Sequence, residues 1–195
     1  MRIILLIALS AALSIGCAPA RLGPLDPQPK IKVDEQGARL ALEIGEEVPD
    51  RFTLPAQGGV RKLRVKGWHE TLTNAFENGL AKAYTLPPPE EEHDLLLVLV
   101  GADLQFLPTP GLATEGSTPA KAKLTYRIRI LDAEGNGLAV AGGEVTSEGT
   151  WSATGEQDVV AEEVVVAMFK DIAYALVTKA TPAAAPADEA PAALD

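Results

Sequence analysis

The sequence contains few of the residues from which catalytic and metal sites are usually built. Its 195 residues include one cysteine, Cys17, and two histidines, His69 and His93. A zinc site needs several cysteine, histidine or carboxylate ligands, and a thiol nucleophile needs a base such as histidine close by. The composition therefore argues against an enzyme, and we expect no catalytic residues, no metal site and no cofactor.

Positive charge is scarce as well. The chain has 17 lysines and arginines against 27 aspartates and glutamates, which gives a formal net charge of -10. Nucleic-acid phosphates require a basic face, so we expect no nucleic-acid partner. The same balance disfavours a polybasic membrane-binding surface. The length fits one domain that buries a core without disulfide bonds.

An apolar run near the N-terminus predicts an export signal. The run covers residues 3–15, follows Arg2, and is interrupted only by two serines. It is too short to span a bilayer comfortably, and it lacks the polar face that a surface helix of the core would have. A short basic region followed by such a run is typical of a secretory signal peptide, which we assign to residues 1–16.

The end of this run resembles a bacterial lipobox. The segment Leu13-Ser14-Ile15-Gly16-Cys17 places a small residue directly before the cysteine, although Ser14 stands where leucine is commonest. The resemblance implies that Cys17 receives a diacylglyceryl group and becomes the acylated N-terminus of a lipid-anchored envelope protein. Because Ala18 and not an aspartate follows, it also implies the outer membrane, facing the periplasm. The alternative is ordinary cleavage after Ala18-Pro19-Ala20, without a lipid.

The remaining chain divides by composition into a tether, a domain and a tail. Residues 17–30 hold four prolines and no periodic apolar pattern, which predicts an extended tether between lipid and domain. Residues 31–179 carry the periodic patterns of a single folded domain. Residues 180–195 are rich in alanine and proline and predict a disordered tail.

Hydrophobic periodicity within the domain predicts strands, a helix, three strands and a second helix. The expected elements are a hairpin over residues 31–44, a loop over 49–59, a strand over 60–66, a helix from Trp68 to Tyr84, a buried strand over 95–104, a hairpin over 121–151 with a bulge at Gly142-Gly143, and a helix over 158–177. The fold class is therefore α+β, a small antiparallel sheet with two amphipathic helices packed on one face. The expected core includes Leu72, Phe76, Leu97, Val98, Ile128 and Met168.

A signal and Cys17 followed by this order of elements resembles the YajG-like lipoproteins. It is similar, more distantly, to the auxiliary lipoproteins of ABC transport systems. The resemblance covers about residues 60–178. It implies a small α+β domain held at a membrane, and it supplies no catalytic residues.

Three groups of residues are candidates for chemistry or binding. The acidic run Glu90–Asp94 with His93 could ligate a hard cation, but consecutive residues of an extended segment point to opposite sides, and we predict a solvated loop. For His69 we predict a surface or helix-cap role. Phe106 and Leu107 precede a long connection; they either cover the end of the sheet or contact a partner.

Two functions from different classes follow from these features. The first is a non-enzymatic, lipid-anchored envelope lipoprotein, a binding or accessory module for a membrane or transport complex with an unidentified envelope protein as partner. The alternative is a small lipid-anchored hydrolase acting on envelope polymers. It would need a pair of carboxylates in a groove, for which Glu144 and Glu148 on one strand face are the candidates.

Overall fold

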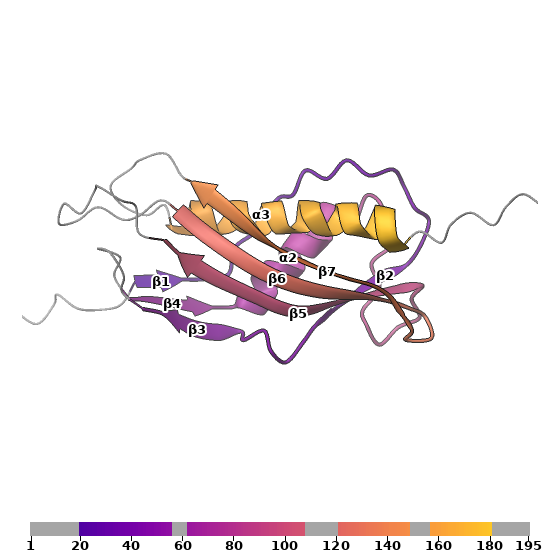
Figure 1. Ribbon diagram of the computed structural model, residues 1–195, viewed down its shortest axis with the longest axis horizontal. Coiled ribbons are helices and arrows are strands. Elements are labelled where there is room, and N and C mark those ends of the chain that lie inside the picture. The colour runs from indigo at the N-terminus through magenta and orange to yellow at the C-terminus, as the bar shows by residue number, and fades with distance from the viewer. Residues whose placement is uncertain (1–19, 56–61, 108–120, 149–156, 181–195) are drawn as a thin grey trace, which may run out of the picture.

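The structure is a computed structural model, which describes residues 20–55, 62–107, 121–148 and 157–180. Cys17, the signal segment and most of the predicted tail therefore lie outside the described residues. The described residues form seven strands and two α-helices in the expected order, strands, helix, strands, helix (Figure 1), which confirms the α+β class. The strands are β1 (Ala20–Leu22), β2 (Leu40–Ile44), β3 (Arg51–Leu54), β4 (Leu63–Lys66), β5 (Leu95–Phe106), β6 (Lys121–Asp132) and β7 (Gly137–Glu148); the helices are α2 (Trp68–Leu80) and α3 (Gln157–Ala175), and α3 continues as a π-helical turn, Leu176–Ala180.

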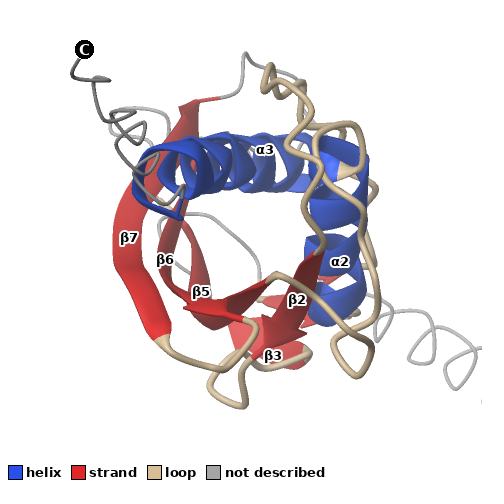
Figure 2. Ribbon diagram, turned by 90° about the vertical axis from the view of Figure 1, so that its right-hand side faces the viewer, coloured by secondary structure: helices blue, strands red, loops and turns tan. Residues whose placement is uncertain are grey.

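The larger sheet has the order β2-β5-β6-β7. Strands β5, β6 and β7 are antiparallel, and β2 runs parallel to β5. Along β6 the even-numbered residues Leu124, Tyr126, Ile128 and Ile130 are buried while their neighbours are not, as the period of two predicts. In the end-on view the strands curve around one side of the molecule, and the two helices close the other (Figure 2).

The smaller sheet has the order β1-β4-β3, with β1 parallel and β3 antiparallel to β4. The expected single antiparallel sheet is thus replaced by two mixed sheets. The predicted hairpin over residues 31–44 is wrong, because β2 pairs with β5 and residues 31–38 form no strand. The predicted loop over residues 49–59 is wrong in part, because it contains β3.

The two helices bury the apolar faces that their periodicity predicts. Helix α2 begins after Gly67, whose left-handed backbone (φ 68°) favours glycine, and it ends before the three prolines at 87–89. Helix α3 packs on β6 and β7, and α2 packs against α3 and β2. All six expected core residues are buried, with exposed fractions of at most 4%. No helix in the described ranges is long and apolar enough to cross a membrane.

A strap of residues 23–38 runs from β1 to β2 and packs along α2. The amide of Leu25 donates to Thr71 Oγ1, and Asn74 Nδ2 donates back to the carbonyl of Leu25. Asn78 Nδ2 donates to Asp26 and to the carbonyl of Pro27. The predicted tether over residues 17–30 is therefore corrected: from Ala20 onward the chain is paired or packed on the domain, because these polar side chains of α2 hold it there.

The predicted bulge at Gly142-Gly143 is also wrong. Both glycines stay in register, opposite Arg127 and Tyr126, and the register shifts lie elsewhere, at Leu99/Gly101 and Ile130/Leu131. A Cβ on Gly142 would lie 2.7 Å from the carbonyl oxygen of Tyr126, and one on Gly143 would lie 3.1 Å from its hydroxyl. The glycines are needed because Tyr126 approaches β7 closely.

Candidate functional site

The second half of β5 has an open edge. Strand β2 pairs with β5 only as far as Leu99, whereas β5 continues to Phe106. From Gly101 onward the described residues pair β5 with β6 alone. Along a strand, the backbone groups of successive residues face opposite sides. The amide of Leu107 donates to the carbonyl of Lys121 on the β6 side. The carbonyl of Ala102 faces the opposite side, where it accepts from the indole of Trp68. The backbone groups of Leu104 and Phe106 therefore face the open side.

A second open edge lies across from the first. Strand β3 is the end strand of the smaller sheet, so one of its edges has no strand partner within the described residues. Between the two edges is a groove of about 410 Å³, lined by Pro49, Phe52, Leu54 and Pro55 on one side and by Ala102–Phe106 on the other. Figure 1 shows β3 and the C-terminal end of β5 at the end of the molecule where β1 lies. Most of these side chains are apolar, and Asp103 is the one carboxylate among them.

Trp68, the first residue of α2, joins the two walls. Its indole is fully buried, and Nε1 donates a hydrogen bond of 3.2 Å to the carbonyl oxygen of Ala102 on β5. Its ring meets Phe52 of β3 edge-on, with centroids 5.9 Å apart. The contact fixes the spacing of the two sheets at this point, and we expect the groove to be largely preformed.

One of the two residues predicted for partner contact lies at this groove. Phe106 lines it, although only 6% of the residue is exposed. Leu107, the next residue in the chain, is half-buried and is not one of the lining residues. The sequence does not reveal Phe52, Leu54 and Pro55 as groove residues, because the helix- and strand-breaking residues in 49–59 predict a loop. It does not reveal the open edges, because strand pairing over long separations leaves no local signal.

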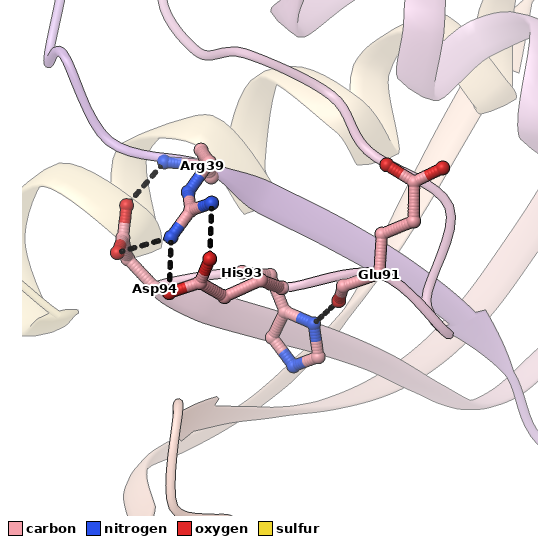
Figure 3. A network of polar contacts seen from close by, with 5 residues as sticks. Arg39, Glu91, His93 and Asp94 are labelled. Atoms are coloured by element: carbon pink, nitrogen blue, oxygen red, sulfur yellow. Dashed lines mark hydrogen bonds and ion pairs between the residues drawn. The ribbon is translucent and has the colours of Figure 1, made fainter.

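The acidic run near His93 has a structural role, which Figure 3 shows in close-up. Glu92 Oε1 lies 3.1 Å from Nη2 of Arg39, and Asp94 Oδ2 accepts the Arg39 amide at 2.7 Å. The hydrogen bond and the charge of Arg39 hold the pKa of Glu92 below its usual range. His93 Nδ1 contacts the carbonyl of Glu91, 2.8 Å away. The run thus attaches the start of β2 to the start of β5.

The other candidates for chemistry also have structural partners. His69 is held by the carbonyl of Val48, 2.6 Å from Nε2, so it ties the start of α2 to the loop before β3. Glu144 is exposed and pairs with Lys123 at 3.1 Å; the side chain of Glu148 lies outside the described residues. Ser147 hydrogen-bonds Glu163 of α3. Among the described residues there is no group of three or more histidines, cysteines or carboxylates placed to hold a metal ion.

One polar group of the core has a shifted proton equilibrium. Burial, helped by the charge and hydrogen bond of Asp171, raises the pKa of Tyr126 to about 12. Its hydroxyl lies 3.4 Å from Asp171 Oδ2. The phenol is therefore neutral at ordinary pH and links β6 to α3. Across the sheet Tyr126 is paired with Ala102, one of the residues that line the groove.

Comparison with known proteins identifies similar folds. No family model matches the sequence, and no curated protein matches it. The crystal structure of a Xanthomonas campestris protein of the DUF330 family superposes with a TM-score of 0.50 at 11% identity, over 81% of this chain and 95% of that one. The chain resembles this protein in fold.

Two bacterial lipoproteins are similar at a lower level. A minor lipoprotein of Acinetobacter baumannii matches at 13% identity and a TM-score of 0.41, over 78% of this chain and 99% of that one. Uncharacterized lipoprotein B of Nitrosomonas europaea matches at 17% identity and a TM-score of 0.35, over 76% and 86%. At such identities the likeness concerns the fold alone. The YajG-like resemblance stays a prediction.

Proposed function

We propose that the chain is a non-enzymatic, lipid-anchored envelope lipoprotein whose domain is a binding or accessory module for a membrane or transport complex. The observation that carries the binding role is the groove between β3 and β5, with an open strand edge on each wall. Two strand edges that have no strand partner among the described residues, beside apolar side chains, suit one occupant well, an extended segment of another envelope protein that adds as a strand. The anchor follows from Gly16-Cys17 after the apolar run.

The hydrolase alternative has less support. A glycoside-cleaving site needs two carboxylates facing each other across a groove. The groove has Asp103 alone, and Glu144 points outward from β7 and is paired with Lys123. Neither arrangement provides an acid and a base around one bond.

Site-specific photo-crosslinking in cells tests the binding role. The crosslinking amino acid p-benzoylphenylalanine replaces Gln105, an exposed residue of the groove, or Val140, which is 72% exposed on β7 and serves as the control. We expect a discrete adduct with one envelope protein from position 105 and none from position 140. Mass spectrometry of the adduct then identifies the captured segment.

The captured segment is next made as a synthetic peptide. Binding by the plain peptide is expected, and N-methylation of its alternate amides should abolish binding, because strand addition depends on those donors. Adducts of equal yield from positions 105 and 140, or a methylated peptide that binds as well as the plain one, would contradict the proposed groove.

A further inference from the structure

The outer face of the smaller sheet gathers positive charge. Alternation along β4 turns Lys62, Arg64 and Lys66 outward, while Leu63 and Val65 between them are buried at 1% exposure. The pairing places Arg21 of β1 beside Arg64, and Arg51 of β3 beside Lys66. We call these five exposed residues, Arg21, Arg51, Lys62, Arg64 and Lys66, the basic face.

The basic face is almost without counter-charges. Arg51 lies 3.5 Å from Asp50, and the other four have no ion pair in the described part of the chain. The remaining outward residue of the three strands is Thr53, opposite Arg64, and it is neutral. Like charges directly opposite each other on neighbouring strands destabilise a sheet. The chain as a whole has a net charge of -10, yet four of these five cations are not paired with its own carboxylates among the described residues. An external anionic surface would supply the counter-charge that this face lacks.

The position of this face relative to the chain's N-terminus indicates which surface that is. Strand β1 begins at Ala20, and only Ala18 and Pro19 separate it from Cys17. Three residue steps span at most about 11 Å, since each extended residue covers about 3.3–3.6 Å. Arg21 is one step further, so a lipid on Cys17 would hold Arg21 within about 14 Å of the lipidated residue, a distance comparable to the Debye length of about 10 Å at 0.1 M salt. A free tether of the predicted length would not have imposed this closeness.

We propose that the basic face docks on the anionic phospholipid surface of the membrane that holds the anchor. This inference rests on the proposed lipidation of Cys17. Electrostatic attraction to anionic head groups acts within about a Debye length, which suits a face tied so near to the anchor. Docking would fix the domain's orientation, and the groove at the edge strand β3 would then open sideways along the membrane, toward a membrane-bound partner.

The experiment uses the processed protein purified from membranes and reconstituted into vesicles. A cysteine for a fluorescent label is introduced by Thr53→Cys on the basic face, or by Tyr174→Cys, 73% exposed near the opposite end of α3, as the control. Vesicles contain phosphatidylcholine alone or with phosphatidylglycerol, plus a lipid carrying a head-group quencher. We expect strong quenching at position 53 and little at 174, in anionic vesicles only, and loss of the difference in high salt.

Charge reversal provides the second arm. The pair Arg21→Glu and Arg64→Glu should abolish the quenching at position 53 while the protein still floats with the vesicles. The matched pair Lys82→Glu and Arg129→Glu changes the net charge equally at exposed sites on other surfaces and should leave the quenching intact. The salt test uses the protein without charge-reversing substitutions, so it stays valid even if either double variant fails to fold.

The outcomes separate the two proposals. If the protein floats with the vesicles but position 53 is quenched no more than 174, or if anionic lipid and salt make no difference, docking is overturned and the anchor stands. If the protein fails to float in both lipid mixtures and carries no lipid, the anchor is wrong and the docking proposal falls with it.

Discussion

Replacing Trp68 by phenylalanine tests how the groove is held open. The change removes the indole N–H and leaves the carbonyl of Ala102, a residue only 3% exposed, without its partner. An unsatisfied buried acceptor costs about 1–3 kcal/mol. The smaller ring also leaves a void of roughly 40 Å³, which at about 24 cal/mol per Å³ adds about 1 kcal/mol. We therefore expect the free energy of unfolding to fall by about 2–4 kcal/mol.

Urea denaturation of the wild type and of Trp68→Phe, followed by far-ultraviolet circular dichroism, measures this cost. The control is Phe169→Leu, a fully buried aromatic residue of α3 with no side-chain hydrogen bond to lose. This change also leaves a void but no unpaired polar group, so the same cavity reasoning gives a cost of about 1 kcal/mol. If Trp68→Phe costs no more than the control, the indole hydrogen bond does not join the two walls of the groove in the way described.

Three further predictions concern the core and β7. Gly142→Ala should destabilise the protein by about 1–3 kcal/mol, because the added Cβ would contact the carbonyl oxygen of Tyr126. Gly137→Ala should be neutral or stabilising by up to about 1 kcal/mol, because nothing lies within 4 Å of the added Cβ. Thermal melting shows whether each variant is more or less stable than the wild type. Phe76→Ala should cost about 3–5 kcal/mol in urea denaturation, since the ring is 3% exposed, and a cost below about 1 kcal/mol would place it outside the core. The absorbance difference between the wild type and Tyr126→Phe should titrate near pH 12, and titration near pH 10 would refute the burial of this phenol. Because the pKa of Tyr126 in the folded protein lies above the ordinary tyrosine value of about 10, the free energy of unfolding should fall between pH 10 and 12, less steeply in the variant.

Elements with strong local patterns could be predicted from the sequence. The stripe that begins at Trp68 and the alternation along β6 correspond to α2 and to a half-buried strand, because both periodicities depend on neighbouring residues only. The core residues followed from the same patterns. The boundary of one helix differs from the prediction: the helix expected to reach Tyr84 ends at Leu80.

Pairing between distant segments could not be predicted. The run Leu40–Ile44 was recognised as a strand, but its partner is β5, more than fifty residues away, and the Arg39 contacts with Glu92 and Asp94 that support this choice cross the same distance. Nothing in the local sequence favours this partner over a hairpin with residues 31–33. The groove depends on the same fact, since it exists where β2 stops and β5 continues.

The basic face also could not be predicted from the sequence. Alternation within the strand expected over residues 60–66 puts Arg64 and Lys66 on one face, but the net charge of the chain argues against a basic surface. Arg21 and Arg51 join them only through the register of β1 and β3. Overall charge averages over the whole surface and does not predict the charge of one face.

Lipid attachment at Cys17 underlies both the proposed envelope function and the docking of the basic face on the membrane. Mass spectrometry of the intact protein, extracted from the membranes of cells that make it, measures both the first residue and any lipid in one experiment. We predict a chain that begins at Cys17 and carries a diacylglyceryl group and an N-terminal acyl chain, and a Cys17→Ser variant that lacks both. A protein that begins at Arg21, without lipid and in the aqueous fraction, would contradict the account.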